Sequence, residues 1–372
     1  MIYLDSAATT YQKPPAVFRA VRGAMASMTS PGRGTYGPAA RASRTLLACR
    51  EEAAALFQVG QPERVVLTFN ATHGLNLAIH SLLKPGDAVV ISGYEHNAVC
   101  RPLYAIPGVR LTVVDAPPFR REQAAEEFRR AILAGADAVI VNHVSNVFGY
   151  VLPVEEVAAL CRRRQVPLIV DASQSAGVLP VRMEDWGAAF VAMPGHKGLY
   201  GPQGTGLLLC QAGGEPLIAG GTGSLSRQPE MPDFLPDRLE AGTHNVPGVA
   251  GLLEGLRFLR RRGIHSLFCH EAALVRQAAE GLAQLPRVQV YSAGEKGCQS
   301  GVLSFRVAGR DPGWVAEELG QRGIAVRAGL HCAPLAHATG GTEATGTVRV
   351  SFSAFNTGQE VERFLKTMRR LG

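Results

Sequence analysis

Residues 188–206 read AAFVAMPGHKGLYGPQGTG, an apolar run of strand length followed by a glycine-rich turn. The run predicts a buried strand, and Pro194-Gly195 would turn the chain so that His196 and Lys197 stand at its end. A lysine there, without a helical face or a neighbouring carboxylate, is poorly explained as a solvated charge or an ion-pair member. Partial desolvation makes an amine nucleophilic, and the glycines would let a bulky aldehyde cofactor approach the backbone. Lys197 is therefore predicted to form a Schiff base, with an ordinary strand-end turn as the alternative.

A second apolar run, VPLIV at residues 166–170, leads directly into Asp171. A carboxylate after a buried strand can keep a pyridine nitrogen protonated, whereas the alternative is that Asp171 caps a following helix. A lysine Schiff base and an acidic partner for the pyridinium nitrogen are the two groups that hold pyridoxal 5′-phosphate in enzymes. Asp171 and Lys197 together predict this cofactor.

The composition limits the classes of protein to consider. A chain of 372 residues with 46% hydrophobic and 19% charged residues suits a two-domain α/β enzyme. The formal charge of +7 comes with arginines scattered over expected helix ends, so we expect no nucleic acid partner. Neither a signal peptide nor an apolar run of membrane-spanning length is visible, so we expect a cytoplasmic protein that binds no membrane.

The seven cysteines form no CxxC pair and are odd in number. This pattern argues for reduced thiols and against a disulfide framework or a metal site. Six of the thiols are expected to pack as small hydrophobic groups. Cys332 differs because it lies in a predicted loop beside His331, where positive neighbours and partial exposure would favour the reactive thiolate.

Strands and helices are expected to alternate from residue 64 onwards, with strands at 65–69, 88–91, 111–114, 138–141, 166–170 and 188–193. Repeated βα units of this spacing predict a largely parallel sheet covered by helices on both faces. We place the domain boundary within a long helical region at 247–285. The prediction is a large cofactor-binding domain at 15–250 and a smaller α/β domain at 251–372 joined by the N-terminal arm 1–14.

Ligands on parallel sheets bind at the carboxyl ends of the strands, and polar residues follow several of the expected strands. The backbone amides of Ala71 and Thr72 and the Thr72 hydroxyl open a helix and could bind phosphate, although Thr72 could equally be a helix N-cap. His96 could stack on a flat cofactor or simply be a packed histidine. Asn146 offers an amide to a cofactor oxygen or a substrate carboxylate.

These stretches together resemble the Suf-type cysteine desulfurases, pyridoxal-phosphate enzymes of the class V aminotransferase group. The resemblance covers nearly the whole chain and is highly specific as a set. Its motifs are Tyr3-Leu-Asp-Ser-Ala-Ala8, Arg33-Gly34, Asn70-Ala-Thr72, Glu95-His-Asn97, Ser145-Asn146, Asp171-Ala-Ser-Gln174, Gly195-His-Lys197, Gly242-Thr243, residues 327–333 and Val348-Arg349.

The resemblance implies a fold-type I homodimer that converts L-cysteine, or L-selenocysteine, to L-alanine and passes the sulfur to an acceptor protein, as in iron–sulfur cluster assembly. Lys197 would form the Schiff base and move protons, and Cys332 would take the sulfur as a persulfide. The remaining roles are Asp171 at the pyridine nitrogen, Gln174 at the phenolic oxygen, His96 stacked on the ring, Thr72 and His196 at the phosphate with Thr243 from the other subunit, and Asn146 and Arg349 at the substrate carboxylate. Alternatives on the same scaffold are a selenocysteine lyase, an aminotransferase or an epimerase, and Arg349 could instead be a strand-end surface charge.

Four residues depart from the pattern of that family. Pro194 stands where a serine often contacts the phosphate, and His73 replaces the usual glutamate. Tyr36 stands where a histidine is common, and Leu330 replaces the first histidine of a frequent His-His-Cys. None of these departures removes a catalytic group, and they suggest a divergent branch of the family.

Overall fold

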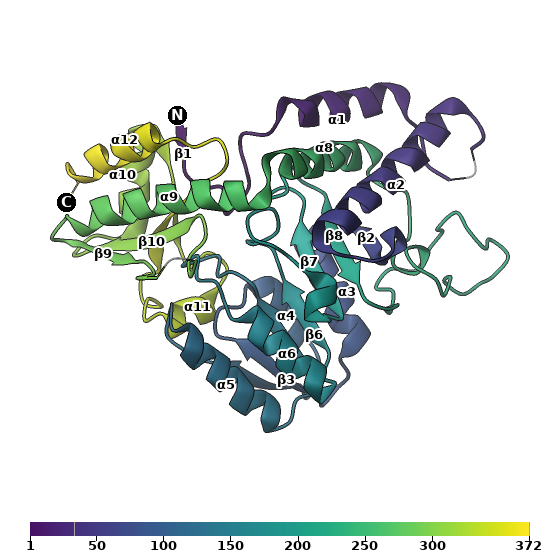
Figure 1. Ribbon diagram of the computed structural model, residues 1–372, viewed down its shortest axis with the longest axis horizontal. Helices are drawn as coiled ribbons and strands as arrows, with labels where there is room; N and C mark the ends of the chain where they lie inside the picture. The colour runs from purple at the N-terminus through teal and green to yellow at the C-terminus, as the bar shows by residue number, and fades with distance from the viewer. Residues whose placement is uncertain (33, 296, 372) are drawn as a thin grey trace.

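The computed structural model describes residues 1–32, 34–295 and 297–371. Figure 1 shows a large sheet with helices on both sides and a smaller sheet beside it, near which both chain ends lie. Arg33, which is one residue of the resemblance, lies outside the described residues. None of the helices in the described part of the chain is both long and apolar enough to cross a membrane.

The large sheet has seven strands in the order β2-β8-β7-β6-β5-β3-β4. Strands β3 to β7 pair in parallel, and β8 runs antiparallel to both of its neighbours, β2 and β7. The strands are β2 (Val65–Thr68), β3 (Ala88–Ser92), β4 (Arg110–Val114), β5 (Ala138–Asn142), β6 (Leu168–Asp171), β7 (Phe190–Pro194) and β8 (Gly206–Cys210). The largely parallel sheet is therefore confirmed, but β8 was missed, although its sequence GLLLC is an apolar run of strand length.

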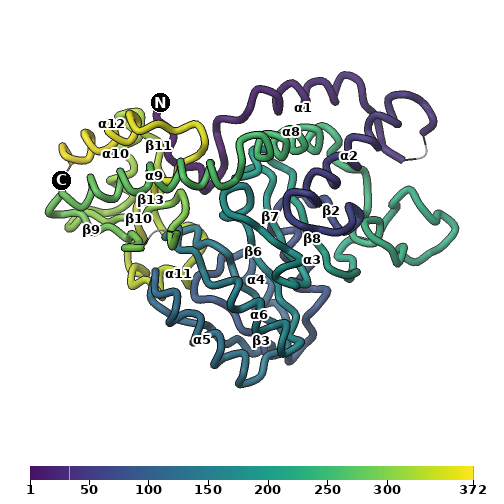
Figure 2. Tube along the Cα trace, in the orientation of Figure 1, coloured from purple at the N-terminus to yellow at the C-terminus, as the bar shows by residue number. Residues whose placement is uncertain are grey.

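Alternate residues of the buried strands face two separate hydrophobic cores, as the two-residue period of a strand requires. In β6, Ile169 packs with helices α3 (Ala71–Leu82) and α4 (Asn97–Tyr104), whereas Val170 packs on the opposite face. That opposite face is covered by α2 (Gly37–Phe57), α5 (Arg121–Leu133), α6 (Val154–Arg164) and α8 (Val246–Arg262). Helix α1 (Pro15–Ser27) packs along α8 (Figure 2). Both faces of the sheet are therefore closed to water except at the edge strand β4, which is mostly exposed. This leaves the strand ends for ligands.

The smaller sheet has four antiparallel strands in the order β12-β13-β10-β9. Their bounds are β9 (Val288–Tyr291), β10 (Val302–Val307), β12 (Arg327–Gly329) and β13 (Thr347–Ser351). Its core includes side chains of α9 (Ile264–Ala283), α10 (Pro312–Gln321) and α12 (Gly358–Met368). The N-terminal strand β1 (Ile2–Tyr3) pairs in parallel with β11 (Ile324–Ala325), which ties the N-terminal arm to this part of the chain.

The long helical region expected at 247–285 is two helices, α8 and α9, separated at Gly263 with φ 79°. Side chains of α8 pack under the large sheet, whereas those of α9 from Leu274 onwards pack with the small sheet. We keep the division into two domains as a proposal, with the change of core between these two helices as its support. The sequence also predicts a single strand at 324–327, but this stretch divides into two short strands, β11 and β12.

Candidate active site

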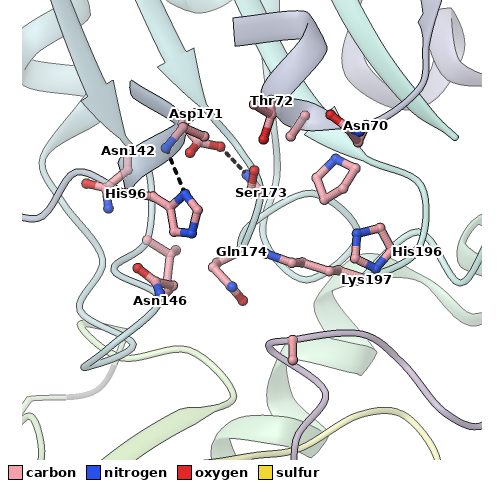
Figure 3. Close-up of a pocket in the computed structure, with 15 residues that line it drawn as sticks. Asn70, Thr72, His96, Asn142, Asn146, Asp171, Ser173, Gln174, His196 and Lys197 are labelled. Atoms are coloured by element: carbon pink, nitrogen blue, oxygen red, sulfur yellow. Dashed lines mark hydrogen bonds between the residues drawn. The ribbon is translucent and has the colours of Figure 1, made fainter. Parts of the chain in front are cut away.

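A cavity of about 230 Å³ opens where the large sheet's parallel strands end (Figure 3). Its walls come from segments that directly follow β2, β5, β6 and β7, and from the start of α4. Sequence-predicted residues that line it are Ala71, Thr72, His96, Asn146, Asp171, Gln174, His196 and Lys197. Residues with no role assigned from sequence also line it, namely Ala8, Ala98, Asn142, Val144 and Ser173.

Lys197 lies in the turn after β7 and is half-buried. Burial lowers the pKa of its amine to about 8, and the nearby cations Arg349 and Arg327 act in the same direction, whereas Asp171 opposes them. The neutral, nucleophilic form of the amine is therefore more populated near neutral pH than in an exposed lysine. The predicted position of Lys197, in a turn at the end of a buried strand, is confirmed. The lowered pKa of its amine suits a reactive lysine.

The glycines around Lys197 have a different reason from the one expected. A Cβ at Gly195 would collide with Thr205, and a Cβ at Gly198 would collide with the backbone carbonyl of Ala176. Neither glycine lines the cavity. They allow the turn to pack against neighbouring protein segments, so the expectation that they make room for a cofactor is wrong.

Asp171 ends β6 and is almost completely buried. Its Oδ1 accepts a hydrogen bond from the backbone N–H of Ser173 at 2.9 Å, inside a turn (Figure 3). Because no helix starts at this turn, the helix-cap alternative is excluded for Asp171. The neighbouring Gln174 donates from Nε2 to the carbonyl of Ala7 at 3.0 Å, which links the cavity wall to the N-terminal arm.

The N-terminus of α3 supplies backbone N–H groups to the cavity. Asn70 is the N-cap, since its side chain accepts from the N–H of His73 at 2.9 Å. Thr72, whose side chain is exposed, is therefore not the cap. The amides of Ala71 and Thr72 precede the first intrahelical donors, so this end of the helix is suited to an anion.

His196 and His96 are both neutral rings at the cavity wall. Burial lowers the pKa of His196 to about 4, and its Nδ1 lies 3.0 Å from the Thr9 hydroxyl. Burial and the nearby Lys197 lower the pKa of His96, whose Nδ1 accepts from the N–H of Ala98 at 3.0 Å (Figure 3). This bond fixes the plane of the His96 ring at the N-terminus of α4.

Two buried polar residues near His96 had no role assigned from the sequence. Glu95 is fully buried, and burial raises the pKa of its carboxyl group to about 8. Its Oε1 accepts from the Ser92 hydroxyl at 2.5 Å and from the N–H of Asn142 at 2.7 Å. Asn142 could have been found, because it directly follows the apolar run of β5.

Arg349 is buried in the middle strand β13, with 3% of its side chain exposed. Its Nη2 donates to Oδ1 of Asp5 at 2.9 Å and its Nη1 donates to the carbonyl of Asn146 at 2.9 Å. The surface-charge alternative is therefore excluded. Its Nε and the Oδ1 of Asn146 are buried without a hydrogen-bond partner among the described residues. Neither Asp5 nor Arg349 lines the cavity directly, but Arg349 is close enough to lower the pKa of Lys197.

Cys332 lies between β12 and α11 (Pro334–Thr339), and its residue is exposed. It does not line the cavity, but its carbonyl accepts from the N–H of Asn97, next to His96, at 2.8 Å. The positive neighbour expected in His331 is absent, because burial lowers the pKa of that imidazole to about 2 and keeps it neutral. The expected loop position and exposure of Cys332 are confirmed.

The other cysteines are less uniform than expected. Four of them, Cys49, Cys100, Cys161 and Cys210, are buried, whereas Cys298 is half-buried and Cys269 is exposed. The expectation of six buried thiols is therefore wrong for two, because these two lie on surface segments. No group of metal-ligating side chains occurs among the described residues.

Thr243 is exposed and does not line the cavity of its own chain. It borders two other hollows, together with its neighbour His244. The structure therefore brings most of the expected site residues together and leaves Thr243 apart from them.

The comparisons with known proteins agree with this geometry. The family described as aminotransferase class-V matches residues 2–364. The chain belongs to this family. Class V aminotransferases depend on pyridoxal phosphate, which is the cofactor predicted from Asp171 and Lys197.

Relatives of this class V chain cover its whole length. A protein of Methanothermobacter thermautotrophicus named "Probable cysteine desulfurase" is 33% identical over 388 residues, which cover 100% of this chain and 94% of that protein. A protein of the same name from Mycolicibacterium paratuberculosis is also 33% identical, but the chain spans 55% of its length.

Solved structures show the same fold. The apo structure of a cysteine desulfurase from Thermococcus onnurineus matches with a TM-score of 0.90 and 32% identity. The match covers 100% of this chain and 94% of that protein's chain. The cysteine desulfurase CsdA from Escherichia coli, in an S-sulfonic acid form, has a TM-score of 0.86 and 28% identity over 99% of this chain and 94% of its own. The fold is therefore the fold-type I pyridoxal-phosphate fold that was expected from the sequence.

The residues of the cavity fit pyridoxal phosphate. A buried carboxylate at Asp171, an amine of lowered pKa at Lys197 and a helix N-terminus at Ala71 and Thr72 are three separate groups. They match a ring nitrogen, an aldehyde and a phosphate, respectively.

Proposed function

We propose that this chain is a cysteine desulfurase, which converts L-cysteine to L-alanine and takes the sulfur on Cys332 as a persulfide. The observation that carries the proposal is that the backbone of an exposed cysteine is hydrogen-bonded to a segment beside the cavity. The carbonyl of Cys332 is bonded to Asn97, and Asn97 follows the cavity residue His96. An exposed thiol on this rim is a feature that a transaminase or an epimerase does not require.

Pyridoxal phosphate supplies an aldehyde that condenses with amines and a conjugated ring that accepts the electron pair released from the substrate. Lys197 would hold the aldehyde, and its amine, once free, would accept and return protons at the substrate carbons. The Asp171 carboxylate would stabilise the proton on the ring nitrogen. His96 would stack on the ring and Gln174 would hydrogen-bond to the phenolic oxygen, while the amides of Ala71 and Thr72, together with His196, would bind the phosphate.

Arg349 and Asn146 bind the substrate carboxylate. A guanidinium is a planar fork that matches a carboxylate, and the buried Nε of Arg349 has no partner among the described residues. Asp5 keeps the guanidinium oriented through the 2.9 Å bond to its Nη2. The substrate carboxylate would therefore lie at Asn146, whose side chain is bonded to the carbonyl of His331, next to Cys332.

Cys332 performs the sulfur transfer as a thiolate. Its sulfur attacks the substrate sulfur, so that an S–S bond forms and the Cβ–S bond of the substrate breaks. The electron pair of the broken bond stays with the carbon fragment, which takes up protons through Lys197 and leaves as alanine. No external oxidant is needed, and the persulfide passes its outer sulfur to an acceptor protein.

We propose further that two copies form a homodimer in which Thr243 of each subunit reaches the phosphate of the other. Its exposure and its distance from the cavity wall of its own chain support this arrangement. A fully active monomer in solution would contradict it.

The test is a comparison of Cys332→Ala with Cys269→Ala, because Cys269 is the exposed thiol on α9. Both variants should bind the yellow cofactor, and Cys269→Ala should make alanine from cysteine at the parent rate. Cys332→Ala should lose alanine production and the persulfide, because cleavage of the carbon–sulfur bond then lacks an acceptor. If Cys332→Ala made alanine at the parent rate, the desulfurase mechanism would be wrong and a lyase would be the better assignment.

A further inference from the structure

Cys332 occupies the third position of a left-handed turn. The N–H of Ala333 donates to the carbonyl of Leu330 at 2.9 Å, which closes a four-residue β-turn. The two central residues, His331 and Cys332, have φ of 50° and 56°. Two positive φ values in succession define a type I′ turn, whose central positions favour asparagine and glycine. For residues with a Cβ, this conformation is strained, because the Cβ lies too close to the following carbonyl oxygen.

A turn with this strain persists only where its surroundings hold it. The carbonyl of Cys332 accepts from the N–H of Asn97 at 2.8 Å, and the carbonyl of His331 accepts from Nδ2 of Asn146 at 2.8 Å. The His331 imidazole is buried, with its Nε2 3.2 Å from the Thr347 hydroxyl. Both central peptide carbonyls of the turn are thus bonded to the segments that border the cavity.

Asn146 is the one side chain among these anchors that also lines the cavity. It is 7% exposed, and its backbone carbonyl accepts from Arg349 Nη1, which is itself bonded to Asp5. A side-chain amide has two N–H donors, and one of them is used by the His331 carbonyl. The second donor is available for a carboxylate in the cavity.

We propose that Asn146 is a positioning residue for the nucleophile: its amide holds the Cys332 turn with one N–H and the substrate carboxylate with the other. Substrate binding then orders the turn that carries the thiol, because both partners restrain the same amide group. The positioning role rests on the proposed function in taking Cys332 as the nucleophile and Asn146 as a group that binds the substrate carboxylate.

Hydrogen exchange of the holoenzyme tests this role without measuring activity. The N–H groups of Ala333 and Asn97 report the turn and its attachment. In Asn146→Ala, one anchor of a strained turn is lost, so both should exchange about fivefold faster, the effect of one ordinary hydrogen bond. The matched control is Gln277→Ala, which removes an amide-to-carbonyl bond with Gly358 at 3.3 Å and should leave both rates unchanged.

A second variant tests the role of Asn146 with less change to the packing of the side chain. Asn146→Asp keeps the size of the side chain but replaces the donor with a carboxylate that repels the His331 carbonyl, so it should accelerate exchange at Ala333 at least as much. L-Alanine, a substrate-like carboxylate, should slow exchange at Ala333 in the parent enzyme and not in Asn146→Ala. Folding is checked by the circular dichroism of each variant.

The outcomes separate the two proposals. Unchanged exchange at Ala333 in both Asn146 variants would overturn the positioning role, even if the enzyme makes alanine from cysteine. Faster exchange in both Asn146 variants, together with a parent enzyme that makes no alanine from cysteine, would support the attachment of the turn to Asn146 and overturn the desulfurase.

Discussion

Removing Glu240 should destabilise the protein strongly, because it breaks a buried bidentate ion pair. Arg50 Nη1 and Nη2 lie 2.7 and 2.6 Å from the two carboxylate oxygens of Glu240, with 8% and 2% of the two side chains exposed. Oε1 of Glu240 also accepts from the N–H of Leu67 in β2 at 2.6 Å. The pair therefore fastens the segment that leads to Thr243 onto the edge of the large sheet.

The magnitude follows from what each substitution leaves behind. In Glu240→Leu, the guanidinium of Arg50 stays buried without its counter-charge, and removing one partner of such a pair costs about 3–5 kcal/mol. Glu240→Gln keeps an oxygen for Leu67 and should fall near the lower end of this range. The double variant Arg50→Met/Glu240→Leu should cost less than Glu240→Leu alone, since no charge is left unpaired.

Urea unfolding followed by circular dichroism measures these free energies of unfolding. The control is Glu126→Gln, which breaks an exposed pair with Arg129 on α5 and should leave the midpoint unchanged. A loss below about 1 kcal/mol in Glu240→Leu, the level of a surface ion pair, would refute the argument from burial. A double variant less stable than Glu240→Leu would refute the argument from unpaired charge.

Three further predictions concern the site. The rate at which the cofactor-free enzyme binds pyridoxal phosphate should rise with pH and level off above about pH 8. The reason is that the neutral fraction of the Lys197 amine rises around its lowered pKa of about 8. A rate that still rises up to pH 10, as expected for a free lysine, would contradict this prediction. Arg349→Lys should raise the KM for cysteine about tenfold or more with cofactor absorbance intact, because an ammonium cannot replace the fork, and unchanged kinetics would exclude the role. Gly198→Ala should destabilise the protein by about 1–3 kcal/mol, because the new Cβ collides with the Ala176 carbonyl. Gly320→Ala is the control, since open space surrounds its Cβ. Equal stabilities of the two variants would contradict the packing argument.

Much of the site could be predicted because its residues follow consecutive strands. Asp171 comes directly after an apolar run of strand length, and Lys197 follows the next such run after a short turn. Parallel strands bring such positions to one edge of the sheet. Local pattern was also sufficient for Cys332, whose loop position and exposure are confirmed. Thr72 shows the limit of local pattern, because only the structure shows that Asn70 is the cap of α3.

The amino-acid sequence by itself determined the alternation of strands and helices, the parallel sheet and the reactive strand-end residues, because these depend on short-range periodicity and on topology. The tertiary structure alone decided that Asp5 pairs with Arg349, that β8 is antiparallel, and that Gly198 is needed for packing. It also decided the left-handed turn at Cys332 and the neutrality of His331. These features depend on which distant segments meet and on how much water is excluded between them, and neither quantity is encoded in a local pattern of residues.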